Sequence, residues 1–395
     1  MRTAVVGGGA AGFFLAINLK ELMPKMEVTI FERSSRVLAK VAVSGGGRCN
    51  CTNTFRLVSD LAQVYPRGHR LLKRLFNVFD QQDAYRWFEQ HGVPLTVQPD
   101  QCVFPAAQDS RAVIDCFLSL ARRYHVDIKT HTKVQSLDDL RGYDCVVVTT
   151  GGSPTGDGLQ WLAALGHEVV TPVPSLFSLA VGDSRLHELQ GLVVSDATVR
   201  LPGTKLQATG PLLLTHWGMS GPAILRLSSY GARLLADSQY RHPISVNWTE
   251  ATEDDVRTLL NETAARQPQK LLTTHSPFGL QQRLWTYLTE RAFGTKPHVR
   301  WSELGKKDVN RLTNTLVNDT YQTTGRAPFR DEFVTCGGVA LASVNPSTLE
   351  SRHVPGLYFA GEVLDIDGIT GGFNFQAAWT TAYVVATSIK NRWAT

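Results

Sequence analysis

The stretch TAVVGGGAAGFFLAINLKELMPKMEVTIFE, residues 3–32, decides the fold of this chain. A β-branched run leads into a cluster of glycines. An apolar segment with helical spacing follows, and a second strand-like run then ends at Glu32. Strand, glycine turn, helix and strand within about 30 residues form the βαβ unit of a dinucleotide-binding domain. The stretch therefore predicts a Rossmann-like domain at the start of the chain.

The glycines of this stretch fit the pattern G-x-G-x-x-G. Gly7 would make the tight turn, Gly9 would let a pyrophosphate reach the backbone, and Gly12 would let helix and strand pack closely. The first helical amides would then face the phosphate. Glu32 follows at the distance where an acid accepts ribose hydroxyls. The residues expected to contact the dinucleotide here are Gly7, Gly9, Ala10, Ala11, Gly12 and Glu32.

Composition and length are those of an ordinary globular protein. The chain has 395 residues, of which 43% are hydrophobic and 19% charged, and its formal net charge is +5. No apolar run reaches the roughly 18 residues of a membrane helix, and no signal peptide precedes the first strand. We therefore expect a cytoplasmic protein without a membrane partner. The six cysteines include only one close pair, so no metal site is expected.

Later stretches look like the missing parts of the same domain. A buried valine strand ends in Thr150 and Gly151, and a strand near residues 357–360 ends in Gly361 and Glu362. A glycine loop then precedes a helix predicted from about Phe375. Such strand ends lie beside the cofactor in doubly wound sheets.

The segment between these stretches differs in character. Residues 173–250 contain short strand-like runs and turns, whereas residues 251–330 contain helical patterns. We therefore predict an α/β protein with a Rossmann-like domain split into residues 1–172 and 331–395. A β domain and a helical subdomain would be inserted between the two parts.

Four motifs resemble the bacterial BaiN/RdsA family of flavoproteins, also described as aminoacetone-oxidase-like FAD-binding enzymes. They are SGGGRCNCTN (44–53), LLLTHWGMSGPAIL (212–225), TCGGV (335–339) and GLYFAGEVLDIDGITGGFNFQAAW (356–379). The resemblance runs from about residue 1 to residue 386. It implies FAD as cofactor and a fold of the two-dinucleotide-flavoprotein type, with an inserted β-barrel-like domain and helical subdomain.

Under this resemblance, further residues would contact FAD. Glycines in succession would let the chain pass against a flat isoalloxazine, where a Cβ would clash, and the amides of the last helix would stabilise negative charge on the flavin. These expected contacts are Ser44, Gly45, Gly46, Gly47, Thr150, Gly151, Gly361, Glu362, Asp365, Gly371, Gly372, Asn374 and Phe375.

The catalytic candidates are Arg48, Cys49 and Asn50. Arg48 would favour an anionic reduced flavin or bind an anionic substrate. Asn50 would orient a carbonyl. Cys49 or Cys51 would donate a proton to carbon, its thiol having a lowered pKa beside a cation and backbone amides.

The resemblance implies several chemistries. Family members are associated with reduction of activated C=C bonds, including in steroid-like acids and in uridine of ribosomal RNA, and others carry an amine-oxidase label. We expect an FAD-dependent oxidoreductase, with ribosomal RNA uridine as the favoured substrate. A peroxide-producing amine oxidase and a non-catalytic flavin-binding RNA or assembly factor are the alternatives. Without a second nicotinamide fingerprint, NAD(P)H would dock transiently.

Residues 67–74 add a basic segment containing Arg67, His69, Arg70, Lys73 and Arg74. It would form either a solvated helix face or a patch for a phosphate-rich partner. The sequence decides neither the oligomeric state nor the electron donor.

Overall fold

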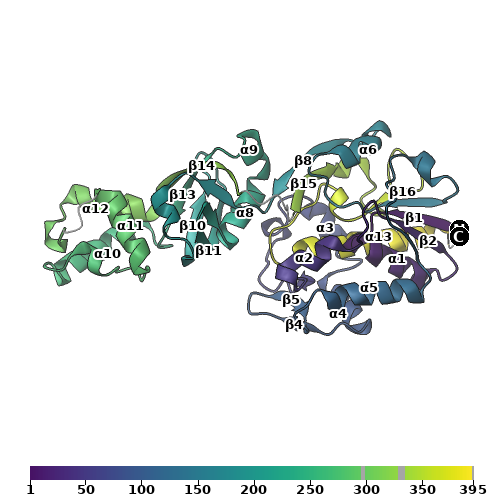
Figure 1. Ribbon diagram of the computed structural model, residues 1–395, viewed down its shortest axis with the longest axis horizontal. Coiled ribbons are helices and arrows are strands. Elements are labelled where there is room, and N and C mark those ends of the chain that lie inside the picture. Colours follow the sequence, from purple (N-terminus) through teal and green to yellow (C-terminus); the bar gives the residue numbers. More distant parts are fainter. Residues whose placement is uncertain (295–298, 328–333, 394–395) are drawn as a thin grey trace. The chain divides into compact units, whose positions relative to one another are not determined.

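The computed structural model describes residues 1–294, 299–327 and 334–393, and its ribbon is drawn in Figure 1. The chain divides into two compact units, the first made of residues 1–175 with 332–395 and the second of residues 176–331. The domain boundary predicted between residues 330 and 331 lies outside the described residues. Within those residues, no helix has the length and apolar character needed to cross a membrane.

A five-stranded parallel sheet forms the centre of the first unit, in the order β16-β7-β1-β2-β6. Its strands are β1 (Arg2–Val6), β2 (Glu27–Phe31), β6 (Asp127–Lys129), β7 (Cys145–Val148) and β16 (Leu357–Phe359). The strands β7 and β16 are fully buried, as expected of parallel strands covered on both faces. Since β16 comes from the far end of the chain, the sheet is completed only when the chain returns from the second unit.

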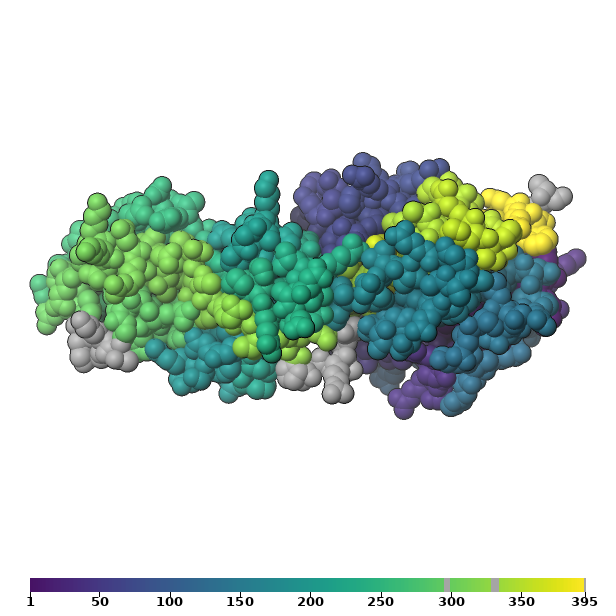
Figure 2. Space-filling view, turned by 90° about the horizontal axis from the view of Figure 1, so that it is seen from above, coloured from purple at the N-terminus to yellow at the C-terminus, as the bar shows by residue number. Residues whose placement is uncertain are grey.

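The helices of the first unit cover this sheet and join the two ends of the chain. They are α1 (Ala10–Leu22), α2 (Ala39–Gly47), α3 (His69–Leu75), α4 (Gln81–Gln90), α5 (Arg111–Arg123), α6 (Gln160–Ala164) and α13 (Phe373–Trp393). Helix α13 packs along α1, with the rings of Phe14 and Trp379 5.1 Å apart. Figure 2 shows early purple-blue and late yellow segments adjoining on the surface of this unit. The last helix begins at Phe373, two residues before the predicted start.

Two small antiparallel sheets complete the first unit. One has the order β3-β5-β4, and the other pairs β8 with β15. Their strands are β3 (Thr52–Asn53), β4 (Leu95–Val97), β5 (Cys102–Pro105), β8 (Val169–Ser175) and β15 (Val334–Val339). Because β8 runs through residue 172, its pairing with β15 holds the chain in the first unit beyond the boundary predicted there.

A closed barrel in the order β10-β11-β12-β9-β14-β13 organises the second unit. Its strands are β9 (Leu179–Val181), β10 (Val193–Arg200), β11 (Gln207–Thr215), β12 (Gly218–Ser220), β13 (Pro243–Asn247) and β14 (Asp319–Arg326). Closure leaves no unpaired sheet edge. Strand β14 lies in the range predicted to be helical. Its sequence DTYQTTGR is polar, so the alternation of buried Asp319, Tyr321 and Thr323 gave little hydrophobic signal.

Six helices accompany the barrel in the described part of the second unit. They are α7 (Ser184–His187), α8 (Pro222–Tyr230), α9 (Ala232–Asp237), α10 (Glu253–Arg266), α11 (Gln282–Phe293) and α12 (Lys306–Val317). Helices α10 and α11 each pack on α12, and the buried side chains of these helices form one hydrophobic cluster with those of the barrel. Trp248, which directly follows β13, and Trp285 of α11 are both fully buried in this cluster.

Candidate functional site

The turn between β1 and α1 has the geometry that the glycine pattern predicts. Gly7 has φ +117°, and a Cβ there would lie 2.4 Å from the carbonyl oxygen of Thr149. A Cβ on Gly12 would lie 2.1 Å from the carbonyl oxygen of Gly7. In contrast, a Cβ on Gly9 would meet nothing within 4 Å, and no side chain caps α1 at this residue. Gly7 and Gly12 are therefore needed for packing, whereas Gly9 leaves room for a group beside the helix N-terminus.

Glu32 closes one side of this turn. Its Oε2 accepts a hydrogen bond from the amide of Gly8 over 2.9 Å, and its Oε1 accepts from the amide of Ser34 over 2.8 Å. These bonds fix the carboxylate directly beside the glycine turn. The carboxylate therefore lies at the turn, and its contact with a ribose stays a prediction.

The C-terminal segment reaches the same turn. Gly361 has φ +78° and lies so close to α1 that its Cβ would be 2.8 Å from that of Ala11. Glu362 follows, and its Oε2 forms an ion pair with Nζ of Lys40 at 2.8 Å. Thr150 and Gly151 lie at the same edge, with the Cα of Thr150 beside Gly7 and Gly151 facing the Glu362 carboxylate. Residues from both ends of the chain therefore meet around one helix N-terminus.

Sequence reasoning missed two polar residues at this edge, Lys40 and Thr335. The amide of Thr335 donates to Oε1 of Glu362 over 2.8 Å, whereas its hydroxyl is buried without a hydrogen-bond partner among the described residues. Lys40 belonged to no motif, and Thr335 was noted only as the first residue of the TCGGV motif, with no role assigned to it. Only the return of β15 beside β8 brings Thr335 to this edge.

The triple glycine does not form the simple loop expected but ends α2. The helical conformation breaks at Ser44, and Gly45, Gly46 and Gly47 then have φ of +56°, +69° and +83°. A Cβ on Gly46 or Gly47 would meet no atom within 4 Å. Three successive left-handed residues therefore leave an open backbone surface that a planar group can approach.

Arg48 lies directly beside this open surface. Its Nε donates to the carbonyl oxygen of Gly45 over 3.2 Å, and its Nη1 donates to Oε1 of Gln108 over 3.3 Å. The guanidinium also lies over the ring of Phe104, 4.3 Å from the ring centroid. Among the described residues it has no carboxylate partner, so its charge remains available to an anionic group. Gln108 and Phe104 had no sequence signal linking them to residue 48.

The two cysteines are buried rather than exposed to the cation. Cys49 and Cys51 have no solvent exposure, and Cys51 Sγ donates to Cys49 Sγ over 3.9 Å. Burial raises the pKa of the Cys51 thiol well above its ordinary value, and the hydrogen bond to Cys49 raises it further. The expectation of a lowered thiol pKa is therefore wrong for Cys51, because burial disfavours the charged thiolate.

Asn50 connects the triple-glycine segment to the C-terminal glycine loop. With its amide oriented to satisfy its neighbours, its nitrogen donates to the carbonyl oxygens of Thr52 and Val103, and its oxygen accepts from the amide of Gly372 over 3.1 Å. The Nδ2 of Asn53 donates to the carbonyl oxygen of Gly371 over 3.0 Å. Asn50 is thus engaged with backbone and positions the two glycine segments against each other.

The remaining expected contacts have mainly local partners. Oδ1 of Asn374 accepts from the amide of Gly368, and its Nδ2 donates to the Gly368 carbonyl, so Asn374 closes the loop before α13. Phe375 stacks on Trp379 with ring centroids 5.4 Å apart. Asp365 is partly buried, and its amide donates to the carbonyl oxygen of Val339. These contacts set the shape of the loop, and Gly371 and Gly372 remain its backbone edge.

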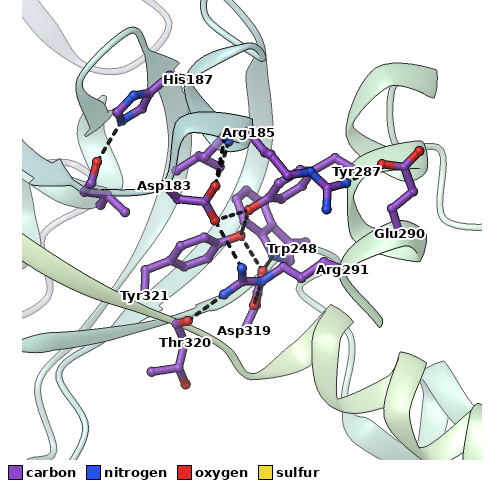
Figure 3. Close-up of polar contacts among 12 residues, drawn as sticks. Asp183, Arg185, His187, Trp248, Tyr287, Glu290, Arg291, Asp319, Thr320 and Tyr321 are labelled. Carbon is purple, nitrogen blue, oxygen red and sulfur yellow. Dashed lines mark hydrogen bonds and ion pairs between the residues drawn. The ribbon is translucent and has the colours of Figure 1, made fainter. Parts of the chain in front are cut away.

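The second unit contains a buried polar cluster of its own, drawn in Figure 3. The Tyr287 hydroxyl donates to Oδ2 of Asp183 over 3.0 Å, and the Tyr321 hydroxyl donates to Oδ2 of Asp319 over 2.5 Å. Arg291 of α11 pairs with both carboxylates, at 3.1 Å from Asp183 and 2.7 Å from Asp319. Burial raises the pKa of Asp319, and its hydrogen bonds oppose that shift. Since these groups satisfy one another, the cluster holds α11 against the barrel.

Comparison with known proteins places this geometry in a family. The family model described as HI0933-like protein Rossmann domain matches residues 1–388. The chain belongs to this family. It is 29% identical to the ribosomal RNA dihydrouridine synthase of Escherichia coli (strain K12), over 97% of this chain and 96% of that protein. It is 27% identical to the 3-dehydro-bile acid delta(4,6)-reductase of Clostridium scindens, over 99% of each chain.

A synthase with the same ribosomal RNA name from Haemophilus influenzae is 26% identical over 98% of each chain. These full-length matches confirm the resemblance, the Rossmann-like FAD-binding fold and the assignment as an FAD-dependent oxidoreductase. The residues present fit that cofactor, because Gly9, Gly46 and Gly47 leave open backbone and α1 is uncapped. The role of each individual residue toward FAD stays a prediction.

Proposed function

We propose that this FAD-dependent enzyme reduces the activated C=C bond of uridine in ribosomal RNA to give dihydrouridine. The observation that carries the proposal is the full-length match to relatives named for two different substrates. Both names describe hydrogen addition to a double bond conjugated with a carbonyl. Relatives from two organisms carry the RNA name, which favours uridine over a steroid-like acid.

The residues of the first unit would divide the work of such a reduction. Once bound and reduced by NAD(P)H, the flavin would supply a hydride to one carbon of the double bond. Gly46 and Gly47 would let the flat ring lie against the backbone, and Glu32 would hold the ribose. Arg48, which lacks a carboxylate partner in the described ranges, would stabilise the negative charge that develops on the carbonyl oxygen of the substrate.

Cys49 is the proposed proton donor to the neighbouring carbon. Its sulfur accepts a hydrogen bond from Cys51, which leaves its own proton free to be directed elsewhere. Cys51 would then keep its proton, since burial raises its pKa. The proposed roles give Cys49→Ser and Cys49→Ala graded losses of reduction, whereas Cys51→Ala would act mainly through the packing around Cys49.

The test is nucleoside mass spectrometry of ribosomal RNA from a strain lacking the gene. Dihydrouridine should disappear from one position and return with the wild-type gene, but not with Arg48→Gln. Unchanged dihydrouridine would refute the RNA substrate. Release of peroxide with amine substrates, and no RNA reduction, would instead support the amine oxidase.

The electron donor and the place of action follow from the same proposal. The sequence has one G-x-G-x-x-G fingerprint, and the described residues of the first unit form one parallel sheet, so we infer that NAD(P)H binds transiently and not on a second Rossmann domain. Anaerobic bleaching of the flavin by NADPH or NADH would identify the donor. Action on ribosomal RNA would place the enzyme in the cytoplasm, which fractionation can test.

A further inference from the structure

Helix α3 carries three exposed cations on one face. They are Arg70, Lys73 and Arg74, and we refer to them as the α3 cationic face. Their spacing of three and four residues places them on neighbouring turns of one helix side. None of the three forms a hydrogen bond or ion pair through its side chain with any described residue.

The opposite face of α3 explains why these cations point to solvent. Leu71, Leu72 and Leu75 are buried on that side. Rotation of the cations into the core would expose these leucines and bury charge, both of which are unfavourable. The orientation of the face is therefore fixed by hydrophobic packing.

The local charge is one-sided as well. Residues 61–79 contain Arg67, Arg70, Lys73 and Arg74 but no aspartate or glutamate. Some other exposed cations of the first unit have a carboxylate close by in the sequence, as Arg86 has Asp83 and Arg141 has Asp138. A surface that carries cations without neighbouring carboxylates attracts a polyanion. A helix face that only needs to be solvated can carry both acidic and basic residues.

Arg67 behaves differently from the other basic residues of this segment. Its guanidinium forms a bidentate ion pair with Asp367, whose side chain is fully buried and also accepts from Ser175. Arg67 is therefore a structural residue. The basic segment read from the sequence thus resolves into one internal anchor and three external cations.

Helix α3 and the residues that precede it contact the C-terminal segment of the candidate site. Gly68 packs on Ile366, and the Tyr65 hydroxyl donates to the carbonyl oxygen of Phe373 over 2.8 Å. Figure 1 shows α3 next to α13, with which it is in contact. Together with the Arg67 anchor, these contacts attach α3 rigidly to the glycine loop that precedes α13.

We propose that the α3 cationic face binds the phosphate backbone of the RNA substrate and so holds the strand beside the candidate site. This inference rests on the proposed function, of which it names the RNA-binding surface. Contacts to phosphate position a strand without reading its bases. The face would therefore supply affinity and orientation, and the glycine-lined site would select the base.

The test uses the FAD-loaded full-length protein and two variants of equal charge change. One is the triple variant Arg70→Gln, Lys73→Gln and Arg74→Gln. The control is Lys25→Gln, Arg122→Gln and Lys390→Gln, which removes three exposed cations elsewhere in the same unit. The probe is the organism's own ribosomal RNA transcribed in vitro. Binding is measured by filter retention across salt concentrations, reduction by nucleoside mass spectrometry, and flavin turnover by NADPH-driven ferricyanide reduction.

For single-stranded RNA, loss of three phosphate contacts should make the negative slope of log affinity against log salt less steep by about 2. At 0.1 M salt this corresponds to an affinity about 100-fold weaker. We expect this loss in the α3 variant alone, with ferricyanide reduction unchanged. Wild-type-like RNA binding by the α3 variant, or an equal loss in the control, would overturn the inference and leave the proposed function standing. RNA binding that depends on α3 without any uridine reduction would instead overturn the proposed function.

Discussion

Replacing Arg67 with alanine should be among the most destabilising single changes in the first unit. Asp367 has no solvent exposure and accepts from Nε of Arg67 at 2.5 Å, from Nη2 of Arg67 and from Ser175 at 3.0 Å. Alanine leaves a buried carboxylate with Ser175 as its remaining side-chain donor. Breaking a buried pair in this way costs about 3–5 kcal/mol of unfolding free energy.

This cost should depend on pH. Burial raises the pKa of Asp367 and the Arg67 hydrogen bonds lower it, so the Arg67→Ala variant raises the pKa further. A carboxyl with a raised folded-state pKa binds its proton more tightly when folded. Its stabilising contribution is complete below the unfolded pKa and is lost as pH rises through the folded pKa. The variant should therefore be less destabilised at pH 5 than at pH 8.

Hydrogen exchange followed by mass spectrometry measures this effect in each unit separately. A loss of about 3 kcal/mol corresponds to exchange more than about 100-fold faster in the slowest peptides of the first unit. Peptides of α11 in the second unit serve as an internal control. Arg70→Ala is the matched exposed change and should shift stability by less than about 0.5 kcal/mol. An effect of Arg67→Ala below tenfold, or equal effects at both pH values, would refute the reasoning.

Three further changes test other parts of the structure. The Gly9→Ala variant should fold normally, because the Cβ position is open, but should lose flavin. The Gly12→Ala variant should lose both its fold and its flavin. Thermal melting and the flavin-to-protein absorbance ratio distinguish these two outcomes. Arg48→Gln should lower uridine reduction more than tenfold while leaving the melting temperature within about 2 °C, since Arg48 has no carboxylate partner in the described chain. Arg291→Ala should destabilise the second unit by about 3 kcal/mol, because it removes the cation that pairs with buried Asp319. Unchanged hydrogen-exchange rates in the α11 peptides would contradict this prediction.

Local pattern was sufficient where one contiguous stretch builds the feature. The βαβ unit could be predicted because β1, the glycine turn, α1 and β2 follow one another, and because Gly12 packs on the carbonyl oxygen of nearby Gly7. The polar strand β14 could not be predicted in this way, because it has few apolar residues and is held by pairing with β9 and β13. The sequence also could not show that Asn374 has a structural role, since its hydrogen bonds to Gly368 form only in the folded loop.

The sequence by itself determined the Rossmann-like start of the chain, the split domain and the family resemblance, because glycine spacing and hydrophobic periodicity are properties of neighbouring residues. Only the tertiary structure decided which charged groups are free to act. Arg67 and Arg70 are three residues apart. Arg67 forms an ion pair with the buried carboxylate of Asp367, 300 residues away in the sequence, whereas Arg70 faces solvent. Whether a charge is paired depends on long-range packing, and desolvation makes that difference energetically large.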